Sequence, residues 1–99
     1  MIPTITIRDK RYEAQKPKAR IWRELCRFDE DKKDLPAEEF LDAHAEIIAK
    51  VFDGITKDDI LDELFIDEIL TTYQEVFSWV ASLITSKLGE IKNVESEGA

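Results

Sequence analysis

The chain has 99 residues, of which 43% are hydrophobic and 36% charged, and a net charge of −8. This length suits one domain with a modest core, and the apolar fraction is too high for a wholly disordered chain. A single cysteine excludes an intrachain disulfide. The sequence lacks both a signal-peptide pattern and the roughly 18-residue apolar run of a membrane span, so we expect a cytoplasmic protein with no membrane contact.

The charge is divided unevenly along the chain. Residues 1–28 carry eight Lys or Arg against three Asp or Glu, a net charge of +5. Residues 29–99 carry six against nineteen, a net charge of −13. An acidic body repels phosphate backbones, so we expect no nucleic acid as the main ligand. The division also suggests self-association, in which the basic start of one copy contacts the acidic body of the next.

The amino-terminal third is predicted to form a hairpin and a helix. β-branched residues alternate over 4–8, Asp9-Lys10 can turn the chain, and 11–14 can form the return strand. Two strands are marginally stable alone, so the hairpin must pack on helices or pair with another chain. Apolar residues then recur at helical spacing over 18–28. The opposite face of this helix carries three basic residues: Arg20, Arg23 and Arg27.

Three further helices are expected. A charged linker at 29–34 precedes a second helix, which begins at Pro36 and whose apolar stripe reaches Phe52. Thr56 to Asp59 resembles a capping box that opens a short helix. The last helix is predicted over 66–91 from an apolar stripe of near-heptad spacing.

The predicted fold class is therefore mostly α (α+β). It consists of a short N-terminal β-hairpin followed by three or four helices, the last one long. We expect one helical domain at 1–92 and a flexible polar tail at 93–99.

Candidate chemical groups are sparse. Cys26 and His44 are too few for a zinc site, and a buried thiol and a helix-face histidine are the simpler interpretation. In a calcium loop counted from Asp29, Asp34 and Phe40 occupy the positions of the required Gly and Glu. The clustered carboxylates of residues 58–68 lie at predicted helix starts, which the helix dipole favours. We therefore expect no enzyme activity, no cofactor and no metal.

Three stretches, taken in order and spacing, resemble a known family. They are KPKARIWR at 16–23, VF with DDILD within 51–62, and DEIL followed by QEVFSWV within 67–80. An extended Ile-Thr-Ile segment precedes them. In this arrangement the chain resembles the tail assembly chaperones of long-tailed phages and of prophages in Gram-positive bacteria, counterparts of the lambda-type G protein.

This resemblance implies a mostly helical protein that acts in the cytoplasm of the infected cell and is absent from the mature virion. Such a chaperone binds the tape measure protein, keeps it soluble and helps recruit the major tail protein. Family members self-associate, so the resemblance also implies a homo-oligomer. An alternative interpretation is a small acidic phage regulator that binds and inhibits a host or phage DNA-binding protein. The basic first helix counts against that alternative.

Trp79 lies beside the main stripe of the last helix and widens it into an aromatic surface. Plain core packing and a face for a partner both remain open as interpretations. The candidates for apolar partner contact are Tyr73, Phe77, Trp79, Val80 and Ile84. The candidates for self-association are Arg20, Arg23 and Arg27.

Overall fold

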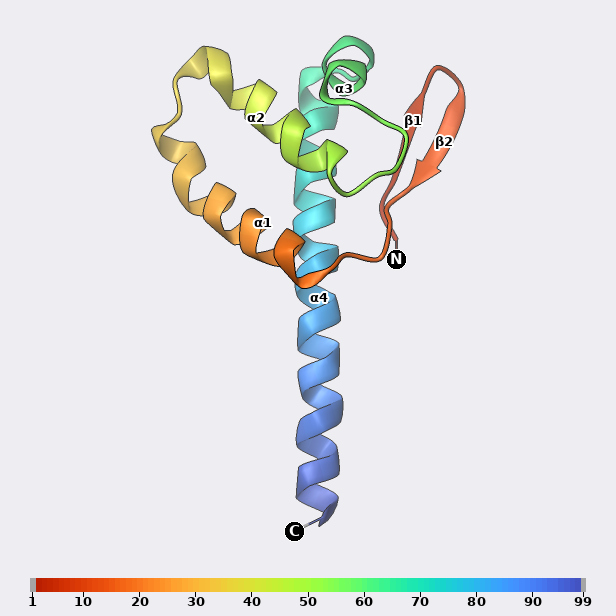
Figure 1. Ribbon diagram of the computed structural model, residues 1–99, viewed down its shortest axis with the longest axis vertical. Coiled ribbons are helices and arrows are strands. Elements are labelled where there is room, and N and C mark those ends of the chain that lie inside the picture. The colour runs from red at the N-terminus through yellow and green to blue at the C-terminus, as the bar shows by residue number, and fades with distance from the viewer. Residues whose placement is uncertain (1, 99) are drawn as a thin grey trace.

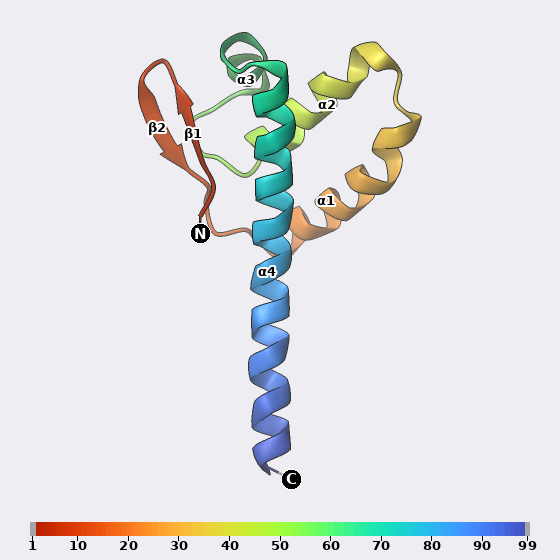
Figure 2. The ribbon, with the colours of Figure 1, turned by 180° about the vertical axis from the view of Figure 1, so that it is seen from behind.

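The computed structural model describes the backbone of residues 2–98 and the side chains of residues 2–90. A two-stranded hairpin precedes the helices α1, α2, α3 and α4, and this arrangement confirms the predicted fold class. Helix α4 (Ile66–Gly98) is the axis of the molecule, with the hairpin on one side and α1 and α2 on the other (Figures 1 and 2). Its 33 residues span about 50 Å at about 1.5 Å per residue. Its lower half projects beyond the other elements (Figure 1).

The hairpin pairs β1 (Thr4–Ile7) with β2 (Lys10–Glu13) in antiparallel register, with Ile7 opposite Lys10. Its two-residue turn is Arg8-Asp9, where φ is 50° and 65°. The predicted turn at Asp9-Lys10 is therefore wrong by one residue. Two positive φ values give the twist that a tight hairpin requires. In this register Ile5 and Ile7 are both buried.

Ion pairs connect the hairpin turn to α3 (Lys57–Glu63). Arg8 donates from Nε to Glu63 and from Nη2 to Asp59, both at 3.1 Å. These carboxylates raise the pKa of Arg8, with the Asp59 hydrogen bond as the largest cause. The predicted capping box is confirmed, because Thr56 accepts from the Asp59 backbone and Asp59 accepts from the Thr56 backbone.

Helix α1 (Ala19–Asp31) continues directly into a 3-10 turn at Lys32–Asp34. The charged linker expected at 29–34 is thus mostly helical, which corrects the prediction. Asp29 gives the reason, because its carboxylate pairs with Lys32 at 2.9 Å and accepts from the Tyr73 hydroxyl at 3.0 Å. The Lys32 hydrogen bond is the largest cause lowering the pKa of Asp29. These charges therefore hold the segment on α4.

Helix α2 (Ala37–Ala49) begins after Pro36 as expected but ends before Phe52, where the sequence pattern predicted it to reach. Val51 is buried in the turn that follows the helix, and Phe52 is buried at an isolated β-bridge. Phe52 bridges to Ala14, and the Val51 carbonyl accepts from the Gln15 backbone at 2.9 Å. Pairing with the chain that leaves the hairpin therefore replaces the last helical turn. Gly54 follows with φ of 83°.

Helix α4 begins as predicted, since the Glu68 carboxylate accepts from the Phe65 backbone at 3.0 Å. The core lies where the upper half of α4 meets α1, α2, α3 and the hairpin. Its largest fully buried side chains are Leu25, Ile48, Ile60, His44 and Val76. The single-domain prediction for 1–92 stays a prediction. The flexible tail expected at 93–99 lies outside the residues whose side chains are described.

His44 makes stability depend on pH. Its ring is 1% exposed, and Nδ1 lies 2.7 Å from the Phe40 carbonyl. Burial is the main cause lowering the pKa of His44 below its ordinary 6.5. The unfolded chain therefore takes up this proton first, so stability is full above about pH 6.5 and falls as pH drops towards the lowered pKa.

We expect urea denaturation to show this loss in the pH range just below about 6.5, where unfolded histidine titrates and most carboxylates are still ionised. The variant His44→Gln should show a flatter profile across the same window. An equally steep profile in His44→Gln would assign the pH dependence to other groups.

Candidate functional site

The projecting half of α4 meets the start of α1 in an apolar groove. Pro17 precedes α1, and Trp22 on its first turns packs against Phe77 of α4 with ring centroids 5.4 Å apart. Below this contact α1 no longer covers α4, because the chain turns away towards the hairpin (Figure 1). The apolar stripe of α4 continues past this point without an internal partner among the described residues.

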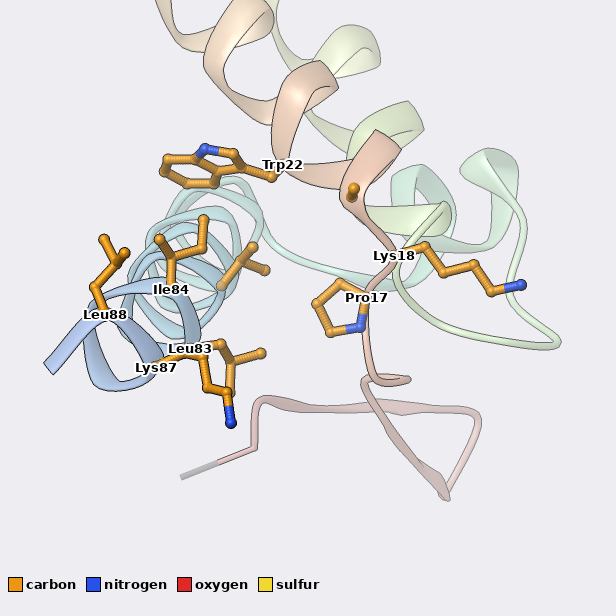
Figure 3. A pocket seen from close by; sticks show the side chains of 9 residues that line it. Pro17, Lys18, Trp22, Leu83, Ile84, Lys87 and Leu88 are labelled. Atoms are coloured by element: carbon orange, nitrogen blue, oxygen red, sulfur yellow. The ribbon is translucent and has the colours of Figure 1, made fainter. Parts of the chain in front are cut away.

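The groove has a volume of about 380 Å³. Figure 3 shows Pro17 and Trp22 facing the side chains of α4, whereas the Lys18 side chain extends away from that helix. The α4 wall carries Leu83, Ile84 and Leu88, which are 39%, 37% and 60% exposed. Ile84 and Leu88 lie four positions apart on one face of the helix, and Leu83 borders that face beside Ile84, so these three form one apolar strip.

Two lysines, Lys18 and Lys87, also line the groove. Lys87 pairs with Glu90 at 3.2 Å, and both side chains are well exposed, so the pair contributes little to stability. An apolar strip of this kind can bury the apolar face of a partner helix. The lining side chains include no carboxylate, thiol, hydroxyl or imidazole for acid–base or nucleophilic chemistry.

The structure separates the predicted partner-contact residues. Tyr73 and Val80 are 2% and 3% exposed and belong to the core, although Val80 also borders the groove. Phe77 and Trp79 are half-buried against that core. Ile84 lies in the groove wall. A direct partner contact by Tyr73 would require the core to open, and the partner-binding roles stay predictions.

Sequence reasoning placed Leu83 and Leu88 in the apolar stripe but did not single them out as site residues. Trp22 and Pro17, at and just before the start of α1, were not predicted as site residues either. The available signal was the length mismatch between a long apolar stripe on the last helix and the shorter helices expected to cover it. Phe65 and Ile66, exposed by 76% and 66%, were likewise missed.

The three predicted self-association residues also differ in position. Arg20 lines a second depression of about 300 Å³, which we call the basic cleft. Its walls include Lys16, Pro17, Lys18, Arg20, Ile21 and Val51. Arg23 and Arg27 are exposed further along α1. Their role in self-association stays a prediction.

Neither a metal site nor a membrane span is found among the described residues. Cys26 is a half-buried free thiol, and His44 is buried with its Nδ1 atom at the Phe40 carbonyl. Within this part of the chain no group of three or more Cys, His, Asp or Glu side chains is placed to hold a metal ion. No helix there is both long and apolar enough to cross a bilayer.

Comparison with known proteins gives one family. The family model described as phage tail chaperone protein matches residues 4–97, nearly the whole chain. No curated protein and no solved structure matches the chain.

Proposed function

The chain belongs to the phage tail chaperone proteins, and from this premise we propose that it binds the tape measure protein and helps recruit the major tail protein. The membership confirms the predicted resemblance and favours tail assembly over inhibition of a DNA-binding protein. The observation that carries the proposal is the apolar groove, with its strip of Leu83, Ile84 and Leu88 exposed to solvent.

The proposed contact is a helix laid in a groove. A tape measure protein has long helical segments with apolar faces, and such faces require cover until they are packed. Full burial of one Leu or Ile side chain contributes about 1.5–3 kcal/mol. Leu83, Ile84 and Leu88 are 39%, 37% and 60% exposed, so burying the rest of all three provides about 2–4 kcal/mol before the costs of association. The groove can therefore hold a partner reversibly.

The proposed mode of action is the reversible burial of apolar surface of the tape measure protein, with no chemical reaction. We propose that the protein is not an enzyme, acts in the host cytoplasm and leaves before the virion is finished. The lining of the groove supports this, because burial of apolar surface requires no reactive group and is undone when the tube protein offers the tape measure a better cover. Polymerisation of the major tail protein would supply that competing surface.

The test is co-expression of the tape measure protein with Ile84→Ser/Leu88→Ser. The wild-type chain is expected to keep the tape measure protein soluble and to be retained with it on an affinity column. The double variant is expected to bind about 10- to 100-fold more weakly, since about 1.4 kcal/mol corresponds to a tenfold change. Addition of the major tail protein to the wild-type complex should first yield a complex of all three proteins, and its polymerisation should then release the chaperone.

The matched control is Ile2→Ser, which changes an apolar side chain that is 47% exposed and lies outside the groove. It should bind like the wild type. Circular dichroism melts of all variants confirm that they remain folded. Undiminished binding of a folded double variant would remove the groove from the proposal.

A further inference from the structure

The turn between α3 and α4 exposes an apolar pair. Phe65 and Ile66 are 76% and 66% exposed, more than any other large hydrophobic side chain among residues 2–90. The backbone is fixed here, because the Phe65 amide donates to the Glu68 carboxylate at the start of α4. The pair therefore stands on a defined turn. Two adjacent exposed apolar side chains contribute little to the core and suit contact with another surface.

Carboxylates surround this pair on both sides. Asp62 and Glu63 precede it, and Asp67 and Glu68 follow it, all four exposed. Glu63 is engaged by Arg8 at 3.1 Å. Asp62 and Asp67 take part in none of the ion pairs formed by the described side chains. We call residues 62–68 the acidic apolar turn.

The basic cleft has the complementary character. Pro17, Ile21 and Val51 give it apolar walls, and Lys16, Lys18 and Arg20 give it positive charge. None of these three cations forms an ion pair with a described side chain, whereas Lys50, which also lines the cleft, pairs with Glu24 at 3.6 Å. Its volume of about 300 Å³ is ample for one aromatic side chain.

We propose that the acidic apolar turn of one copy docks into the basic cleft of a second copy. Phe65 would enter the apolar part of the cleft, and Asp62 and Asp67 would meet Lys16, Lys18 or Arg20. The cleft is lined mainly by residues at the start of α1, and this part of the chain lies well apart from the upper end of α4, where the turn is, in both views (Figures 1 and 2). The occupant is therefore another molecule of the chain.

Because this contact joins two different surfaces of the chain, the same contact can form again between each copy and the next. Each copy retains one unused turn or cleft, and the assembly grows into a ring or an open helix rather than stopping at a dimer. This inference concerns the chain alone and does not depend on the tail-protein contact proposed above. It also narrows the predicted self-association residues to Arg20.

The test is multi-angle light scattering on the purified full chain and on two variants. The wild type is expected to form species larger than a dimer, whose mass falls as ionic strength rises from about 0.01 M to about 1 M and the Debye length shrinks from about 30 Å to about 3 Å. Phe65→Ser and Arg20→Glu should each be monomeric. An equimolar mixture of the two should give a dimer and nothing larger, because it contains one intact turn and one intact cleft per pair.

Two controls separate a loss of assembly from a loss of folding and from a general effect of charge. Ser suits the position before a helix, and Phe65 lies outside the core, so Phe65→Ser should melt like the wild type. Arg27→Glu makes the same charge change on the same helix and should assemble like the wild type. A monomeric wild type, a mixture that stays monomeric or exceeds a dimer, or an Arg27→Glu variant as defective as Arg20→Glu would each overturn the proposal.

Discussion

Replacing Leu25 by Ala is expected to lower the free energy of unfolding by about 2–5 kcal/mol. Leu25 is fully buried and is the buried side chain of α1. Its removal leaves a cavity that the surrounding α4 and α2 side chains fill only in part. For a domain of this size each kcal/mol lowers the melting temperature by about 4–8 °C. The loss is therefore a large share of a typical stability of about 5–15 kcal/mol.

Urea denaturation followed by circular dichroism measures this effect. Leu88→Ala removes the same atoms from a side chain that is 60% exposed and should change stability by no more than about 0.5 kcal/mol. Because α1 supplies one wall of the groove and of the basic cleft, Leu25→Ala should also weaken partner binding under conditions where it is still folded. A Leu25→Ala variant as stable as Leu88→Ala would contradict the packing described for α1.

Replacing Tyr73 by Ala is expected to cost about 3–5 kcal/mol, as for other buried aromatic side chains. Tyr73 is 2% exposed, and its ring meets those of Phe28 and His44 at centroid distances of 5.3 and 5.0 Å. The Lys32 amine lies 4.8 Å from the ring centroid. One side chain thus joins α4 to α1 and α2, so its loss affects all three helices.

Tyr73→Phe separates the ring from the hydroxyl group. The hydroxyl donates to Asp29 at 3.0 Å, and burial, followed by this hydrogen bond, raises the pKa of Tyr73, so the donor stays protonated across the ordinary pH range. Asp29 keeps its Lys32 partner at 2.9 Å and remains exposed, so the lost hydrogen bond should cost only about 0.5–1.5 kcal/mol. Equal losses for Tyr73→Phe and Tyr73→Ala would place the stabilisation in the hydrogen bond instead of the ring.

The order and type of the helices could be predicted because local signals agree with the fold. Pro36 begins one helix and the Thr56–Asp59 capping box begins another, and both signals depend only on neighbouring residues. The errors arose where distant contacts decide the backbone. Phe52 leaves α2 to pair with Ala14, 38 positions earlier in the chain. Asp29 remains helical because of Tyr73, and neither partner can be identified from periodicity.

The groove shows the same limit. The stripe on the last helix identified the apolar face of α4, and Ile84 was placed on it correctly. Periodicity defines which side chains share a face but not how far along that face another helix provides cover. The boundary between core and surface falls near Val80 only because the chain turns from α1 towards the hairpin at Pro17. Tyr73 and Leu88 therefore have similar sequence patterns and opposite exposure.

Pro17 and Lys18 line both the groove and the basic cleft. A ligand that displaces this shared wall when it binds in the groove changes the shape of the basic cleft. By thermodynamic linkage, a ligand in the cleft then changes the affinity of the groove to the same extent. A tail component in the groove would then change the strength with which neighbouring copies hold each other, and neighbours would change its affinity by the same factor. Binding of several copies to one long partner would in that case be cooperative. The displacement of Pro17 and Lys18 would decide whether the cooperativity is positive or negative.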